Sequence, residues 1–242
     1  MTYNEAIMIP LHAIPISSLA WLIGMLACLI IAIKCTIRYK RYGLELSKYM
    51  AWFCVAIAVT LSCMSIPSFF TLNLHTLRAF YMVSEVFFYV GMAGQAAIFW
   101  CVLLRSYVRL RFVILPILII SVPACVYSFE LAYLTHRGNF ITYNDPYGSA
   151  LVIAGMMGGL FIPVGLYFLL TASRQKGHKE ALTSMTFGAV YIGVGLVTAV
   201  FEIIDAKLMT PKTMFVDLFL FSFLLLSAVW PRHGQSFTGR ST

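Results

Sequence analysis

The sequence predicts an all-α membrane protein in which seven transmembrane helices form a single domain, residues 1–242. Of the 242 residues, 61% are hydrophobic and 11% are charged, whereas a soluble domain carries about 25% charged residues. The apolar residues fall into seven runs, each close to the ~20 residues that span a bilayer as a helix. Because the runs are continuous rather than alternating, they favour helices over a β-barrel. We therefore expect an integral, multi-pass protein of a plasma or inner membrane.

The seven runs occupy most of the chain and leave only short polar joints between them. They cover residues 13–33, 49–71, 79–104, 112–134, 150–172, 182–206 and 214–231. No basic n-region precedes the first run, so it is interpreted as a retained helix and not as a signal peptide. The longest joint, 135–149, combines turn signals with aromatic side chains. We expect it to form a lid over the outer opening, with interfacial anchoring as the alternative.

The basic residues predict the orientation of the bundle, because Lys and Arg collect in the loops that stay in the cytoplasm. When the joints are assigned alternately to the two sides, 13 of the 17 Lys and Arg residues fall on one side. This predicts an N-terminus outside and a cytoplasmic C-terminus. The positive charge then reflects membrane insertion and attraction to anionic lipid, not nucleic-acid binding. The basic inner face also suits a membrane or cytoplasmic protein partner.

The third run carries small and polar residues on one helix face. Ser84, Gly91 and Gln95 fall at i, i+7 and i+11, and faces that meet inside a membrane are enriched in such residues. Glu85 lies at the edge of this face, about 10 Å below the outer surface. An ionisable residue at this depth usually faces a cavity or a partner. We therefore predict that Ser84, Glu85 and Gln95 belong to a ligand or proton site and that Gly91 is a packing residue.

The fifth run contains a pair of glycines four residues apart, Gly155-x-x-x-Gly159. This spacing lets two helix backbones approach closely. The sequence therefore predicts helix packing at both glycines, with a kink near Pro163 one turn later.

The sixth run presents one stripe of small and acidic residues. It consists of Gly188, Gly195, Thr198, Glu202 and Asp205. The two glycines are predicted to pack against another helix, which turns Thr198, Glu202 and Asp205 into the bundle. Asp217, at the start of the seventh run, lies at a similar depth. These polar residues are further candidates for a ligand or proton site, and snorkelling to the surface or pairing with Lys207 and Lys212 is the alternative.

We expect no cofactor. Retinal requires a lysine in the last helix, and the run 214–231 has none. A transmembrane haem requires histidines inside helices, but all five histidines fall at helix ends or in joints. The chain shows no paired spacing of metal ligands and no nucleophile–base motif, so an enzyme is not expected.

These observations favour a receptor-like or sensory bundle with an acidic outer cavity for a small cationic or polar ligand, which signals through a separate partner. A small-solute or proton-coupled transporter is the first alternative. It draws support from "MVSEVFF" at 82–88 and "MFVDLFL" at 214–220, whose 132-residue offset matches a parallel repeat of the kind found in some transporters. An accessory subunit of a membrane complex is the second alternative.

Overall fold

The computed structural model describes residues 15–137, 140–175 and 177–208. These residues form six α-helices and one β-hairpin. The helices are α1 (Ile16–Tyr42), α2 (Glu45–Ser65), α3 (Leu74–Phe99), α4 (Arg111–Leu131), α5 (Tyr147–Ala172) and α6 (His178–Leu208). A 3₁₀ turn (Ile66–Phe69) extends α2, and a π-helical turn (Trp100–Leu104) extends α3. The hairpin consists of β1 (Tyr133–Arg137) and β2 (Phe140–Asn144).

The described helices have the length and hydropathy of an integral membrane protein. Five are long and apolar enough to cross a membrane, namely α1, α2 and α3 with their extensions, α4 and α5. The sixth, α6, contains a shorter apolar stretch, Ser184–Val200. The helical membrane bundle that the sequence predicts is therefore observed. The predicted seventh run, 214–231, lies outside the described residues.

Helix ends differ from the predicted runs because helices continue into polar sequence. Helix α1 extends nine residues past the predicted end and stops where Gly43 adopts φ 65°. At such a positive φ glycine avoids the steric cost of a Cβ. Helix α3 begins earlier than predicted because the Asn73 side chain accepts a 2.9 Å hydrogen bond from the backbone N–H of His75, as N-cap residues do.

The hairpin is the main departure from the predicted all-α fold. Helix α4 ends at Leu131 and not at residue 134, and most of the predicted joint 135–149 forms two antiparallel strands. Tyr133 pairs with Asn144, and Arg137 pairs with Phe140. The turn signals of the joint pointed to a loop, while the alternation that marks a short strand was not recognised.

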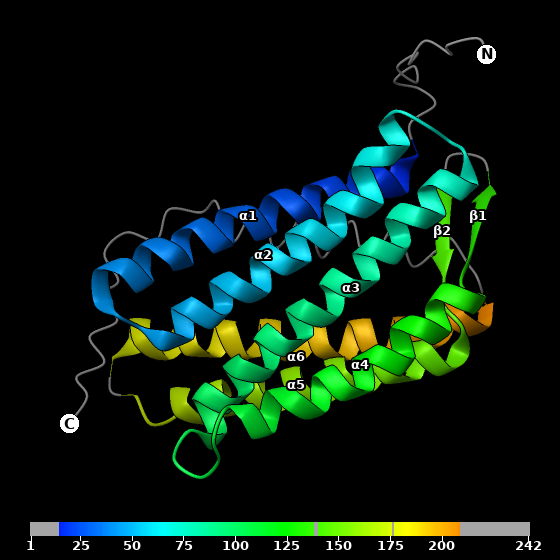
Figure 1. The fold of residues 1–242 in the computed structure, drawn as a ribbon. Coiled ribbons are helices and arrows are strands. Elements are labelled where there is room, and N and C mark those ends of the chain that lie inside the picture. Colours follow the sequence, from blue (N-terminus) through cyan, green and yellow to red (C-terminus); the bar gives the residue numbers. More distant parts are fainter. Residues whose placement is uncertain (1–14, 138–139, 176, 209–242) are drawn as a thin grey trace.

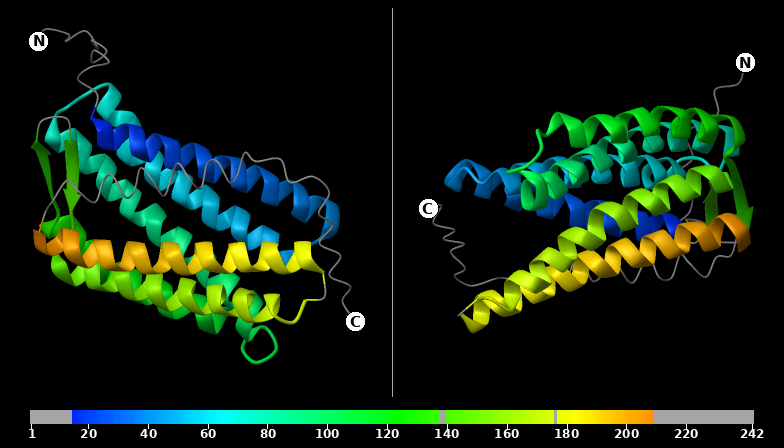
Figure 2. Two further views of the ribbon diagram at one scale, coloured as in Figure 1. Left: turned by 180° about the vertical axis from the view of Figure 1, so that it is seen from behind. Right: turned by 90° about the horizontal axis from the view of Figure 1, so that it is seen from below.

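The helices pack as an antiparallel bundle with the hairpin across one end. Helices α1, α2 and α3 lie side by side, α4 and α5 pack against α3, and α6 packs mainly on α5 (Figures 1 and 2). The hairpin lies where α1, α3 and α5 begin, and it contacts α1 and α3. We call this the hairpin end of the bundle.

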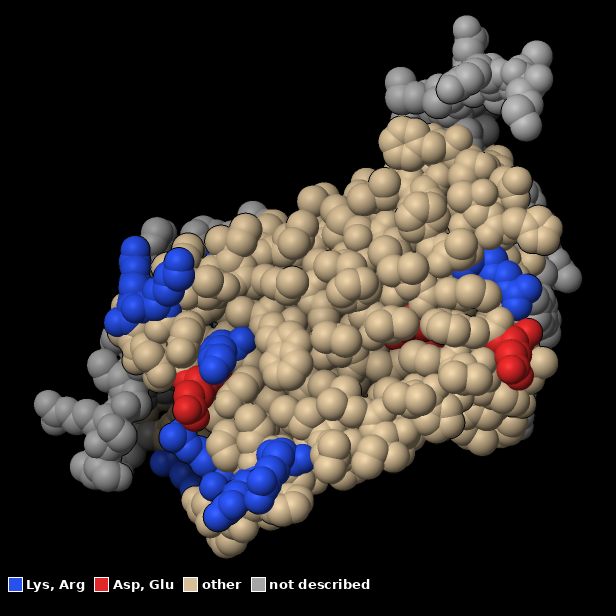
Figure 3. Space-filling model, in the orientation of Figure 1, with Lys and Arg blue, Asp and Glu red and all other residues tan. Residues whose placement is uncertain are grey.

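The two ends differ in charge. Most described Lys and Arg side chains gather at the end opposite the hairpin (Figure 3). They include Lys34, Arg38, Lys40, Arg41, Lys48, Arg105, Arg109, Arg111 and Arg174. An ion pair joins Arg105 to Glu45 there, with 3.2 Å between Nη1 and Oε2.

We expect little stability from this ion pair, because the Arg105 and Glu45 side chains are 60% and 42% exposed and exposed pairs contribute about 0.2–1 kcal/mol. The substitution Arg105→Gln should lower the free energy of unfolding by about 0.5 kcal/mol or less, measured by denaturant titration in detergent. A loss above about 1.5 kcal/mol would contradict a solvated pair.

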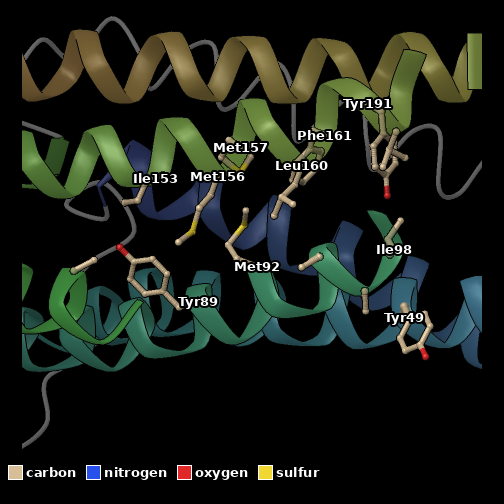
Figure 4. Close-up of a cluster of buried hydrophobic side chains, with 14 residues drawn as sticks. Tyr49, Tyr89, Met92, Ile98, Ile153, Met156, Met157, Leu160, Phe161 and Tyr191 are labelled. Atoms are coloured by element: carbon tan, nitrogen blue, oxygen red, sulfur yellow. The ribbon is translucent and has the colours of Figure 1, made fainter. Parts of the chain in front are cut away.

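The main apolar core lies between α3 and α5. Met92 of α3 faces Met156, Met157 and Leu160 of α5, and Phe161 continues the cluster towards Tyr191 of α6 (Figure 4). The ring centroids of Phe161 and Tyr191 are 5.3 Å apart.

Close helix approach occurs at other glycines than the predicted pair. A Cβ at Gly155 or Gly159 would meet nothing within 4 Å among the described residues, and both glycines are exposed. A Cβ at Gly188 would instead lie 2.7 Å from the carbonyl oxygen of Gly165, and one at Gly195 would lie 2.7 Å from Cβ of Phe161. Among the described helices this pair lies away from the α5–α6 contact, and packing at Gly155 and Gly159 stays a prediction.

The sequence also predicts that Gly91, in α3, is a packing residue. A Cβ there would lie 2.9 Å from Cδ1 of Ile57 on α2. Its neighbour Gly94 approaches backbone directly, at 3.1 Å from the nitrogen of Phe53. Small residues on this part of α3 thus let α2 come close.

Candidate functional site

Two carboxyl groups meet at the hairpin end of the bundle. Glu85 projects from α3 and is only 6% exposed. Asp145 follows β2 and precedes α5, so the chain brings it to the same end from the hairpin side. If both groups were ionised they would repel each other, because each lies within the electrostatic reach of the other. We call Glu85 and Asp145 the acid pair.

The hydroxyl group of Tyr81 joins the acid pair. It donates a short hydrogen bond to Oδ1 of Asp145. The same hydroxyl lies within hydrogen-bonding reach of the Glu85 carboxyl. Tyr81 stands four residues before Glu85 on α3, and this spacing places both side chains on one helix face. One tyrosine therefore links a helix carboxyl to a hairpin carboxyl.

Hydroxyl groups from three helices surround the acid pair. Ser128 of α4 and Ser149 of α5 lie 2.6 Å apart, oxygen to oxygen, and Ser149 also donates to the carbonyl of Ala124 at 3.2 Å. Ser128 hydrogen-bonds the Asp145 carboxyl. Tyr89 of α3 lies beside Glu85 and Ser149, and its buried hydroxyl has no hydrogen-bond partner within the described residues.

The hairpin covers this site through aromatic and backbone contacts. The Tyr143 ring stacks on the Tyr81 ring at 4.7 Å and 18° and packs on Trp21 at 5.0 Å. The Tyr143 hydroxyl donates to the carbonyl of Met64 at 3.2 Å. Ile141 is fully buried, and its N–H donates to Oγ of Ser17 at 3.1 Å. The hairpin is thus held by α1, α2 and α3 together.

Among the side chains that the structure describes, no ion pair joins a cation to the acid pair. Arg105–Glu45 is the one ion pair found there, and it lies at the opposite end. Arg78, the nearest arginine along α3, donates to the carbonyl oxygens of Phe129 and Glu130 at 3.0 and 3.3 Å. Oε2 of Glu85 has no hydrogen-bond partner in the described chain. Negative charge on the acid pair is therefore not balanced by a described cationic side chain.

The surroundings shift the titration of Asp145, which lies outside the helices. Burial is the largest effect and raises its pKa to about 6, while the hydrogen bonds from Tyr81 and Ser128 act in the opposite direction. Burial favours the neutral carboxyl because a charge loses its hydration in the protein interior.

Ser84 and Gln95, the other predicted site residues of α3, do not contact the acid pair. The Ser84 hydroxyl donates to the Tyr81 carbonyl at 2.7 Å, and the Ser84 carbonyl accepts from Thr60 of α2 at 3.3 Å. Gln95 lies ten residues, or about 15 Å, further along α3 than Glu85. It is fully buried, and both its amide atoms lack partners among the described residues. Glu85 and Gln95 therefore lie at different depths of the bundle, and a cavity that contains both stays a prediction.

The sixth-run candidates lie on a different helix pair. Thr198 is half-buried on α6, which packs mainly on α5. Glu202 and Asp205 fall in the last two turns of α6, near the hairpin end (Figure 1). Their side chains, like Asp217, lie outside the described part of the chain.

Sequence reasoning missed most of the site. Asp145, Tyr81 and Tyr89 were not singled out as site residues. The spacing between Tyr81 and Glu85 was a usable signal, since i and i+4 share a helix face. Asp145 was placed in the expected lid, but its Asn-Asp-Pro context indicated only a turn.

The described residues contain no group of three or more His, Cys, Asp or Glu side chains suited to a metal ion. Comparison with protein-family models gave no match, and no curated protein matches the sequence.

Proposed function

We propose that this protein is a receptor-like, sensory bundle of seven transmembrane helices, with its N-terminus outside and its C-terminus in the cytoplasm. Its hairpin end faces outwards and binds a small cationic ligand at the acid pair, Glu85 and Asp145. The signal passes to a separate partner at the basic inner end. The observation that carries this proposal is a buried pair of carboxyl groups without a described cation beside it.

The chemistry of the site favours a cation over a neutral ligand. Moving an unpaired charge out of water costs several kcal/mol, so an ionised acid pair is costly until a cation joins it. The hydroxyl groups of Ser128, Ser149 and Tyr89 add oxygen acceptors around a bound ammonium group. The Tyr81 and Tyr143 rings add π faces that attract cations. An organic cation that carries N–H groups uses both kinds of contact.

The proposed orientation rests on the basic residues used in the sequence analysis, which gather at one end of the bundle. Basic residues mark the cytoplasmic ends of membrane helices, and the described Lys and Arg gather opposite the hairpin. The hairpin then lies on the outer surface, where it covers the acid pair in the manner of a lid.

Thermal unfolding in the presence of cations tests this proposal. The purified protein is heated at pH 8 with spermidine, methylammonium or tetramethylammonium, and with uncharged alcohols of similar size as controls. A ligand present at about 100 times its Kd adds about 2.7 kcal/mol of stability. We expect at least one cation to raise the midpoint of unfolding and the alcohols to leave it unchanged.

The matched variants are Glu85→Gln and Glu130→Gln. Glu130 is exposed at the end of α4, so its substitution removes the same charge without touching the acid pair. We expect the cation-dependent shift to disappear in Glu85→Gln and to persist in Glu130→Gln. Equal shifts in both variants, or no shift with any cation in the wild type, would overturn the proposed site.

A further inference from the structure

The Tyr81 hydroxyl lies between two carboxyl groups but carries only one hydrogen. A phenol carries a single hydrogen and therefore donates to one acceptor at a time. Here the hydroxyl donates to Asp145 and also approaches the Glu85 carboxyl. If Glu85 were ionised, its oxygen would face the phenol oxygen with no hydrogen between them. A proton on one carboxyl completes a chain of two hydrogen bonds from Glu85 through Tyr81 to Asp145.

The hydrogen-bond chain Glu85–Tyr81–Asp145 is joined to the hairpin through Asp145. Asp145 directly follows β2 and is the hairpin's polar contact to Tyr81. Tyr143, two residues earlier, stacks on the ring of the same Tyr81. One polar and one aromatic contact of this segment thus meet at the same α3 side chain, and a change in the acid pair acts on one of the contacts that keep the hairpin docked.

We infer that the hairpin is a proton-operated latch: one proton shared along Glu85–Tyr81–Asp145 keeps it docked, and loss of that proton releases it. The inference rests on the proposed site and names its regulation. The docked hairpin covers a protonated pair, and release leaves two ionised carboxylates that are open to a cationic ligand. Protons and cations then compete for the same two groups.

Other titratable or charged groups face this site from several elements. The tyrosines and cysteines among them have ordinary pKa values well above neutral pH, and Arg78 is held on the carbonyl oxygens of α4. Among the side chains that the structure describes, titration between pH 5 and 8 is therefore assigned to the acid pair. The other groups are Cys63 of α2, Arg78, Tyr81 and Tyr89 of α3, Cys125 of α4 and Tyr143 of β2.

The sign of the pH dependence follows from Asp145. Its pKa is about 6 in the docked state, against an ordinary value of about 3.9 for a solvated aspartate. Between these two values the docked state binds more protons than the released state, so docking weakens as the pH rises. Docking is strongest below pH 4 and weakest above about pH 7. From pH 5 to pH 8 the docking equilibrium should fall about tenfold.

Hydrogen–deuterium exchange of the hairpin tests the latch directly. The full-length protein in lipid nanodiscs, without added cations of the ligand panel, is labelled at pH 5, 6, 7 and 8. Exchange times are corrected for the pH dependence of intrinsic amide exchange. We expect protection of the peptide covering residues 133–144 to fall about tenfold from pH 5 to pH 8. Constant protection across this range overturns the inference.

Three substitutions separate the latch from a merely structural contact. In Asp145→Asn, protection should no longer depend on pH. In Glu85→Gln, the amide can donate to the Tyr81 oxygen in place of the shared proton, so the hairpin should stay protected at pH 8. In Tyr81→Phe, Asp145 loses a hydrogen bond that lowers its pKa, so the transition should move to higher pH. Glu130→Gln should keep the wild-type profile.

A wild-type pH profile in Asp145→Asn, or in Glu85→Gln, contradicts the latch even when the hairpin exchanges slowly. If Asp145→Asn fails to fold, Tyr81→Phe takes its place as the test. A transition that does not move to higher pH in that variant contradicts the latch. The cation experiment tests the receptor proposal separately from the latch. If exchange depends on pH but no cation shifts thermal unfolding, the latch is retained and the receptor proposal is wrong. The opposite result retains the cation site and removes the latch.

Discussion

Gly165→Ala should destabilise the bundle by about 3 kcal/mol, which lowers the midpoint of thermal unfolding by roughly 10 °C. A Cβ at this position would lie 2.6 Å from Cγ1 of Ile192 and 2.8 Å from the carbonyl oxygen of Gly188. The second contact is with backbone, which no rotamer change can relieve. Helix α6 would have to move away from α5, and the contacts of Phe161 with Tyr191 and Gly195 would loosen with it.

Gly159→Ala is the matched control on the same helix. No described atom lies within 4 Å of the new methyl group, and alanine is favoured over glycine in a helix by about 1 kcal/mol. We expect its unfolding midpoint to equal or exceed that of the wild type. Both variants are measured by thermal unfolding in the same detergent. Equal midpoints for the two variants would mean that the α5–α6 approach at Gly165 does not contribute to stability.

The two glycines also show how far the sequence predicts this fold. Long apolar runs identify membrane helices because bilayer thickness fixes their length. Which face of a helix meets its neighbour is not set by thickness. Gly155 and Gly159 have the spacing of a packing motif, but the close contact falls at Gly165, whose relation to Gly188 depends on how α5 and α6 cross. Spacing within one helix contains no information on that crossing.

The residues of the candidate site also differ in whether the sequence predicts them. Glu85 could be predicted from the sequence because a carboxyl inside an apolar helix is costly wherever it points. Asp145 could not, since a carboxyl in a polar joint has no cost until the joint folds back. The hairpin supplies that fold, and its register places Tyr143 on Tyr81 and Asp145 on the same hydroxyl. Contacts between a loop and a helix far away in sequence leave no periodic signal.

Tyr143→Ala should release the hairpin at every pH. The substitution removes the ring that stacks on Tyr81 and packs on Trp21, together with the hydroxyl bonded to Met64. Loss of a buried aromatic ring costs about 3 kcal/mol or more, which exceeds the tenfold effect expected from the acid pair between pH 5 and 8. Protection of residues 133–144 against exchange should therefore be low at pH 5 as well as at pH 8, and the pH dependence should vanish because the docked state is no longer populated.

Tyr143→Phe separates the ring from its hydroxyl. It keeps both aromatic contacts and loses one hydrogen bond, for which we expect about 1 kcal/mol, so the hairpin should stay docked at pH 5 and exchange somewhat faster throughout. The two variants compare the contributions to docking of the hairpin. We expect ring stacking to decide whether the hairpin docks, and the acid pair to set the pH at which it is released. Wild-type protection of Tyr143→Ala at pH 5 would contradict this order. Docking of the hairpin would then not depend on the Tyr143 ring, and its release would depend on the protonation of the acid pair alone.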